Sequence, residues 1–82
     1  MGKRIKANLY DLVDNGIVYV SYIHVTNKEG VKGILYRLDG YLTQTQREVL
    51  AKFKNVSTGV ATYKYDPRNR CDYVVIFDKC IK

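Results

Sequence analysis

Hydrophobic and polar residues alternate along the first part of the chain, as they do in half-buried strands. Within residues 4–13, four apolar residues fall on one face: Ile5, Ala7, Leu9 and Val13. Asp14-Asn15-Gly16 follows, and Asn-Gly is a strong hairpin signal because both residues tolerate positive φ. Residues 17–26 are rich in β-branched and aromatic side chains, which favour strands. The pattern therefore predicts a β-hairpin over this part of the chain.

A third strand is predicted over residues 31–38, with Ile34, Tyr36 and Leu38 on its inward face. The segment Asn27-Lys28-Glu29-Gly30 has the composition of a turn and separates this strand from the preceding one. Asp39-Gly40 ends the strand, because neither residue favours extended structure.

The period of the apolar residues then changes from two to that of a helix. The apolar stripe consists of Leu42, Gln46, Val49, Leu50 and Phe53, where Gln46 is the one polar member. Two capping boxes compete for the start of the helix: Thr45 with Glu48, and Thr43 with Gln46. Asn55 is acceptable just after the last turn. We expect a short amphipathic helix over residues 44–55, packed by one face.

Two more strands are predicted over residues 58–65 and 71–79. Asp66-Pro67-Arg68-Asn69 suits a type I turn between them, with Asp first and Pro second. Five consecutive apolar residues, from Tyr73 to Phe77, indicate that the last strand is central in its sheet. Asp72 and Asp78 flank this run and are interpreted as charged residues that oppose aggregation.

These elements predict one α+β domain over residues 1–82, a mostly antiparallel five-stranded sheet in the order β-β-β-α-β-β. A single helix on one face leaves the other face for solvent, a partner, a second copy, or burial by curling of the sheet itself. The predicted members of that uncovered face are Tyr10, Val18, Val20, Tyr22, Leu35, Val74 and Ile76.

Composition narrows the class of protein. Of the 82 residues, 46% are hydrophobic and 27% charged, which is typical of a globular domain. The basic start of the chain is not followed by the apolar stretch of a secretory signal, and no apolar run approaches the ~20 residues of a membrane helix. Cys71 and Cys80 would lie on opposite faces of one strand, too far apart to bridge. We therefore expect reduced thiols and a cytoplasmic location.

Candidate chemistry is sparse. His24, Cys71 and Cys80 are the only soft metal ligands, and no two of them have a chelating spacing, so no metal site is predicted. The six glycines are dispersed, which argues against a phosphate-binding loop and leaves no predicted cofactor. With one histidine and no catalytic motif, the chain is not expected to be an enzyme.

Binding is the better supported class of function. A net charge of +6, eight tyrosines and no tryptophan resemble the composition of sheets that stack bases on aromatic rings and hold phosphates with Lys and Arg. The predicted nucleic-acid-binding residues, for DNA or RNA, are Lys3, Arg4, Lys6, Tyr10, Tyr22, Tyr63, Lys64, Tyr65, Arg68 and Arg70. The excess of basic residues is spread along the chain, and tyrosine is also an ordinary strand residue.

The alternative function is protein–protein interaction. A small chain without catalytic residues, with an incompletely covered sheet, also suits a virus- or mobile-element-encoded factor that inhibits or regulates a host protein. A homodimer is compatible with either function, because two copies can pair uncovered faces or edge strands. No membrane partner is predicted.

Overall fold

The computed structural model describes residues 5–63 and 66–82, and it describes side chains for residues 5–60 and 71–82. Its elements are two helices and four strands. In chain order they are α1 (Leu9–Asp14), β1 (Tyr19–Thr26), β2 (Lys32–Leu38), α2 (Gln44–Ala51), β3 (Val56–Tyr63) and β4 (Asp66–Phe77).

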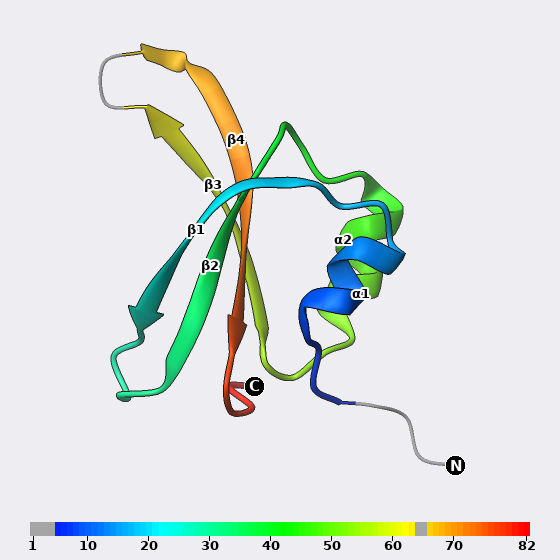
Figure 1. Cartoon of the computed structure of the whole chain (residues 1–82), viewed down its shortest axis with the longest axis vertical. Helices are drawn as coiled ribbons and strands as arrows, with labels where there is room; N and C mark the ends of the chain where they lie inside the picture. The colour runs from blue at the N-terminus through cyan, green and yellow to red at the C-terminus, as the bar shows by residue number, and fades with distance from the viewer. Residues whose placement is uncertain (1–4, 64–65) are drawn as a thin grey trace.

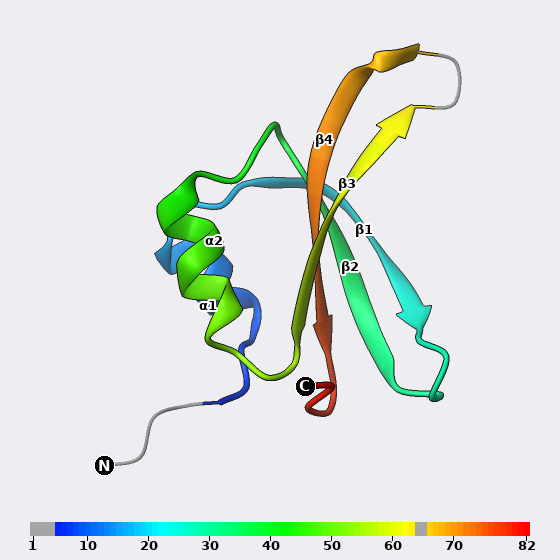
Figure 2. The same cartoon turned by 180° about the vertical axis from the view of Figure 1, so that it is seen from behind.

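The four strands form one antiparallel sheet in the order β1-β2-β4-β3, and both helices lie on the same side of it (Figures 1 and 2). The α+β class and the antiparallel sheet are confirmed, as is the central position of the last strand. The five-stranded order was wrong: among the described residues there are four strands and a second, short helix.

The missing strand is the one predicted over residues 4–13, whose second half forms α1. Asn8 is the N-cap: its side chain accepts from the backbone N–H of Tyr10, and its own N–H donates to Asp11 Oδ2. These bonds satisfy amides at the start of the helix that otherwise lack partners. The alternating apolar residues therefore do not form a strand. Leu12 lies in α1, and its side chain is fully buried in the core.

The hairpin predicted at Asp14-Asn15-Gly16 was wrong, because these residues form the C-terminal end of α1. Gly16 has φ of 70° and follows the C-cap Asn15. The Gly16 N–H donates to Val13 O, and the Ile17 N–H donates to Leu12 O at 2.9 Å, which is the Schellman arrangement. The positive φ of Gly16 thus ends α1, and β1 begins three residues later at Tyr19.

β1 and β2, the strands predicted over residues 17–26 and 31–38, pair as an antiparallel hairpin across the predicted turn. Its turn is held by Asn27, whose side chain accepts from the N–H groups of Glu29 and Val31. On β2, Tyr36 and Leu38 are buried, and Ile34 packs against the core, so the inward face predicted for this strand is confirmed.

α2 begins with the capping box of Thr43 and Gln46, one of the two that the sequence offered. The helix ends at Ala51, earlier than predicted, and Asn55 is not its C′ residue. Asn55 is buried, where its side chain accepts from the Ala7 N–H and donates to the carbonyls of Ala7 and Phe77. These bonds join the segment before α1 to the end of β4.

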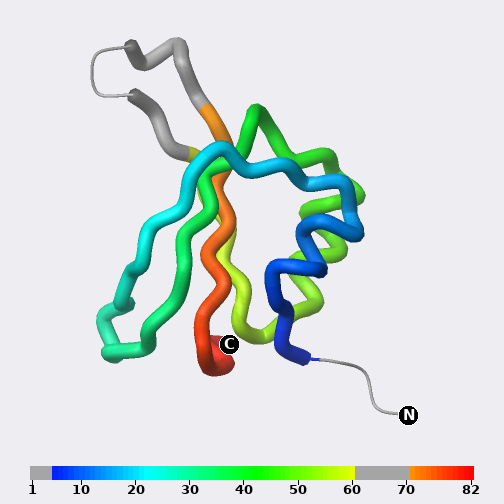
Figure 3. Tube along the Cα trace, in the orientation of Figure 1, coloured from blue at the N-terminus to red at the C-terminus, as the bar shows by residue number. Residues whose placement is uncertain are grey.

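The chain ends close to the same junction. After β4 the C-terminal residues turn back toward the segment between α2 and β3 (Figure 3), where the N–H groups of Ile81 and Lys82 donate to Lys54 O. The Lys54 N–H in turn donates to Ile5 O. Three segments that are far apart in sequence are therefore tied together at one end of the sheet.

The last two strands form the predicted hairpin, but the turn lies elsewhere. The type I turn predicted over residues 66–69 was wrong, because these residues belong to β4 and Asp66 pairs with Tyr63. The link between the strands, residues 64–65, lies outside the described residues.

The core lies between the helices and one face of the sheet. Tyr36 pairs with Val74 across β2 and β4, and both side chains are buried there. Tyr10, Tyr22, Val74 and Ile76 were predicted for the uncovered face of the sheet, which was wrong. Val74 and Ile76 face the helices and the core, Tyr22 pairs with Tyr36 on that same face, and Tyr10 belongs to α1. Ile23, Leu35 and Val75 pair with one another across β1, β2 and β4. They lie on the opposite face of the sheet from the core residues Tyr36 and Val74.

Candidate functional site

A hollow lined mainly by aromatic side chains lies where β1 and β2 extend from beneath the helices. We call it the tyrosine hollow. Its volume is about 360 Å³, and it is lined by Leu9, Tyr19, Tyr22, His24, Ile34 and Tyr36. One lining residue comes from α1 and the others from β1 and β2. It is therefore a surface built on a hairpin and closed at one side by a helix.

A register shift in β1 brings the three tyrosines together. Tyr22 pairs with Tyr36, but the register shifts between Tyr19 and Ser21. Side chains three residues apart point to opposite faces of a regular strand, whereas one extra residue returns them to the same face. Tyr19 and Tyr22 consequently both line the hollow.

Most ring pairs of the hollow pack edge to face, and the rings of Tyr22 and Tyr36 are tilted at 41°. The ring centroids of Tyr19 and Tyr36 are 5.0 Å apart at 66°, and those of Tyr19 and Tyr22 are 6.4 Å apart at 78°. The rings of Tyr22 and His24 are 6.5 Å apart at 83°. These separations and angles are favourable for aromatic pairs. Each ring is thus held by a neighbour, although the side chain of Tyr22 remains exposed.

The surroundings of Tyr36 change the acidity of its hydroxyl group. Burial raises the pKa of Tyr36 above its ordinary value, and the neighbouring phenols of Tyr19 and Tyr22 raise it further. The cause is that a buried phenolate loses solvation and would be repelled by other phenolates. The Tyr36 hydroxyl, a hydrogen-bond donor at neutral pH like any phenol, therefore ionises only at more alkaline pH than an ordinary tyrosine.

A second hollow continues from the first along the start of α1. It has a volume of about 320 Å³ and shares Leu9, Ile34 and Tyr36 with the tyrosine hollow. Among its other lining residues are Lys6 and Asp78. The second hollow, next to the aromatic rings, is therefore lined by one basic residue, Lys6, and one acidic residue, Asp78.

The structure describes only some of the predicted nucleic-acid-binding residues. Lys3, Arg4, Lys64 and Tyr65 lie outside the described residues. Tyr63 ends β3, and Arg68 and Arg70 belong to β4, but their side chains are not among those described. Tyr10 is exposed on α1 and does not line either of the two hollows.

The structure brings two of the predicted residues to connected hollows: Tyr22 lines the tyrosine hollow, and Lys6 lines the second one. The prediction omitted Tyr19, His24 and Tyr36. From the sequence, Tyr36 was predicted on the inward face of its strand and Tyr22 on the uncovered face, and in a regular strand Tyr19 and Tyr22 fall on opposite faces because they are three residues apart. A strictly alternating pattern hides their proximity, and no glycine in β1 signals the irregularity that creates it.

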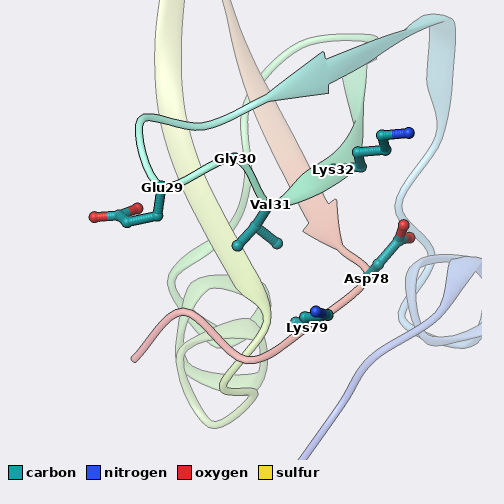
Figure 4. A pocket seen from close by; sticks show the side chains of 6 residues that line it. All are labelled: Glu29, Gly30, Val31, Lys32, Asp78 and Lys79. Carbon is teal, nitrogen blue, oxygen red and sulfur yellow. The ribbon is translucent and has the colours of Figure 1, made fainter.

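Two further hollows show no convergent chemistry. One, of about 290 Å³, is lined by Glu29, Gly30, Val31, Lys32, Asp78 and Lys79. In Figure 4 the Glu29 carboxylate extends away from Lys32 and Asp78. The other lies beside the start of α2, where Thr43 and Gln46 are already bonded to each other as a capping box. In neither hollow do several polar side chains point toward one position that a ligand could occupy.

The described residues also contain no group of three His, Cys, Asp or Glu side chains that could hold a metal ion. Cys71 is buried, Cys80 is exposed, and both are free thiols. Within the described part of the chain, no helix has the length and apolar character needed to cross a membrane. No protein-family model, curated protein or solved structure matches this chain.

Proposed function

We propose that this chain is a small, non-enzymatic nucleic-acid-binding module whose contact surface is the tyrosine hollow together with basic residues beside it. The observation that carries the proposal is the cluster of three tyrosine rings on one face of the β1–β2 hairpin, in which Tyr22 is exposed, Tyr19 is half-buried and Tyr36 is buried. Aromatic side chains on a sheet are the usual platform on which proteins stack nucleobases.

The charge of the protein supports this function. A net charge of +6 attracts a polyanion, and Lys6 lies on the hollow that adjoins the rings. Lys3 and Arg4 precede Lys6 in the sequence and add two positive charges to the same segment. In this arrangement the rings contact bases while the N-terminal basic residues contact phosphates.

The test is fluorescence anisotropy with labelled single- and double-stranded DNA and RNA, from about 50 to 300 mM salt. We expect affinity to fall linearly on a log–log plot against salt, because bound Lys and Arg release counterions. Lys6→Ala should weaken binding and lower the salt slope by about one. Lys28→Ala, in the turn between β1 and β2, is the matched control and should leave the slope unchanged.

Two results would contradict the proposal. One is the lack of binding to all four nucleic acids at the lowest salt. The other is weak binding that disappears by about 150 mM salt, which would reduce the charge to a solubility feature.

A second candidate function is protein–protein interaction, and the edge strand β1 favours it. Its outer edge has no strand neighbour among the described residues, and Val20 and Ile23 are exposed on it, as is Val18 just before it. Its eight residues contain no charged side chain and no proline, the usual protections of an edge. A partner, including a second copy, could add a strand there. Failure of all four nucleic acids to bind would favour this function.

A further inference from the structure

The tyrosine hollow has flat aromatic walls and no Lys, Arg, Asp or Glu among its lining residues. Tyr22 is 58% exposed, so one ring is open to a ligand, while Tyr36 is buried. The edge-to-face contacts among the rings restrict their orientation before anything binds. A planar ligand therefore meets a surface that needs little further ordering, which favours affinity.

The size of the hollow restricts what can occupy it. About 360 Å³ lies near the lower end of the roughly 300–1,000 Å³ typical of small-molecule sites. One flat ring system suits such a space, whereas a stack of several does not.

The accessibility of base faces adds a second restriction. In a duplex the faces of the bases are stacked on one another, and a protein reaches only their edges in the grooves. Aromatic side chains can stack on a base only where it is unpaired and unstacked. We infer that the tyrosine hollow binds one unpaired nucleobase of a single strand, an inference that rests on the proposed function.

The polar groups at the hollow suit this ligand. A tyrosine hydroxyl is protonated at neutral pH, so the hydroxyl of Tyr36 can donate to a base carbonyl or ring nitrogen. The strand would continue along the second hollow, where Lys6 is available to a phosphate. Asp78 on the same hollow repels phosphate and limits the attraction by Lys6, so the stacked base supplies the preference for a single strand.

Three labelled probes of one length test the inference: a mixed-sequence single strand, its duplex, and the same single strand with abasic sites. The intact and abasic single strands carry the same number of phosphates, so they are the matched pair. We expect the intact single strand to bind roughly 5- to 150-fold more tightly than the abasic strand, the range expected for one stacked base. The duplex should bind more weakly than the intact single strand.

The outcomes separate the inference from the proposed function. Equal affinity for the intact and abasic strands, or tighter binding of the duplex, would overturn the inference and leave nucleic-acid binding standing. No binding of any probe would overturn both.

Two single substitutions test whether the base binds in the tyrosine hollow. Tyr22→Ala should lower affinity for the intact strand by a similar factor and leave affinity for the abasic strand unchanged. Tyr41→Ala is the matched control, because Tyr41 is 63% exposed and lies outside the tyrosine hollow. An equal effect of the two variants would overturn the assignment of the site.

A measurement on the unaltered protein covers the case in which Tyr22→Ala fails to fold. A bound base places its ring current next to the methyl groups of Leu9 and Ile34, which line the hollow. The intact strand should shift their NMR signals, and the abasic strand should not. A strand that binds without shifting them would overturn the inference.

Discussion

Asp72 is fully buried at the point where β4 passes the start of α2. Its Oδ2 accepts from the Leu42 N–H at 2.6 Å and from Arg47 Nη2 at 2.7 Å. Its Oδ1 has no hydrogen-bond partner among the described residues. A buried carboxylate is tolerated only when other groups compensate its charge, so the Arg47 guanidinium is the contact on which this site depends.

Arg47→Ala is therefore expected to destabilise the fold. Removing one partner of a buried pair costs roughly 3–5 kcal/mol, and the low end applies here because the Leu42 N–H still donates and the Arg47 side chain is 39% exposed. The measurement is the free energy of unfolding from urea denaturation at neutral pH. Lys52→Ala, an exposed cation on the C-cap of α2, is the matched control.

The double variant Arg47→Ala with Asp72→Asn distinguishes lost charge compensation from lost packing. A neutral amide in place of the carboxylate should restore part of the stability that Arg47→Ala removes, because no unpaired charge remains buried. An Arg47→Ala protein within about 0.5 kcal/mol of the wild type would contradict this account, since that is the range of ordinary surface substitutions.

Single polar residues are where sequence interpretation failed most clearly. Asp72 was interpreted as a charged residue that opposes aggregation and Asn55 as a helix C′ residue, yet both are buried and hydrogen-bonded inside the fold. Their partners lie far away in sequence: Asn55 bonds Ala7, 48 residues earlier, and Asp72 bonds Leu42, 30 residues earlier. A local pattern carries no information on such pairs, because only the folded chain brings them within hydrogen-bond distance.

At the scale of elements, residues 4–13 show two local signals in competition. Alternation of apolar residues favours a strand, whereas Asn8 followed by Asp11 is a capping pair at the spacing that starts a helix. The helix forms because the cap satisfies its first amides and Leu12 reaches the core. Elements with one unambiguous signal, such as β2 and the turn at Asn27–Gly30, were predicted correctly.

Asn8→Ala tests this explanation of α1. Loss of the side chain removes the acceptor for the Tyr10 N–H, and an N-cap substitution of this kind costs about 0.5–2 kcal/mol. The unfolding free energy from urea denaturation gives the change. Asn8→Ser preserves an N-cap oxygen and should stay close to the wild type. If the Ala and Ser variants were equally destabilised, the cap would not be what stabilises α1.

At the scale of the whole molecule, the class of fold was predictable and the site was predictable only in part. Apolar periods of two and of 3.6 residues suffice to indicate an α+β chain with an antiparallel sheet. The tyrosine hollow needs more, because it combines Leu9 of α1 with Tyr22 and Tyr36 of paired strands and depends on the register shift in β1. Tyr22 and Lys6 were predicted, but the rings around Tyr22 were not.

The tyrosine hollow also links the stability of the whole molecule to alkaline pH. In the unfolded chain a tyrosine ionises near pH 10, whereas burial and the neighbouring phenols raise the pKa of Tyr36 in the folded protein. Above about pH 10 the unfolded state therefore binds fewer protons at this residue than the folded state, and the unfolding free energy falls as pH rises. Below about pH 9 both states are protonated and the contribution is constant.

Tyr36→Phe removes the ionisable group and keeps the ring, so its unfolding free energy should fall less steeply than that of the wild type between about pH 9.5 and 11. Urea denaturation at a series of pH values gives the two slopes. Tyr41→Phe removes a phenol that is exposed in the folded protein and should retain the wild-type slope. Lysine deprotonation affects all three proteins alike. Parallel slopes for Tyr36→Phe and the wild type would show that the hydroxyl of Tyr36 remains solvated after folding, and the tyrosine hollow would then be more open to water than its buried floor implies.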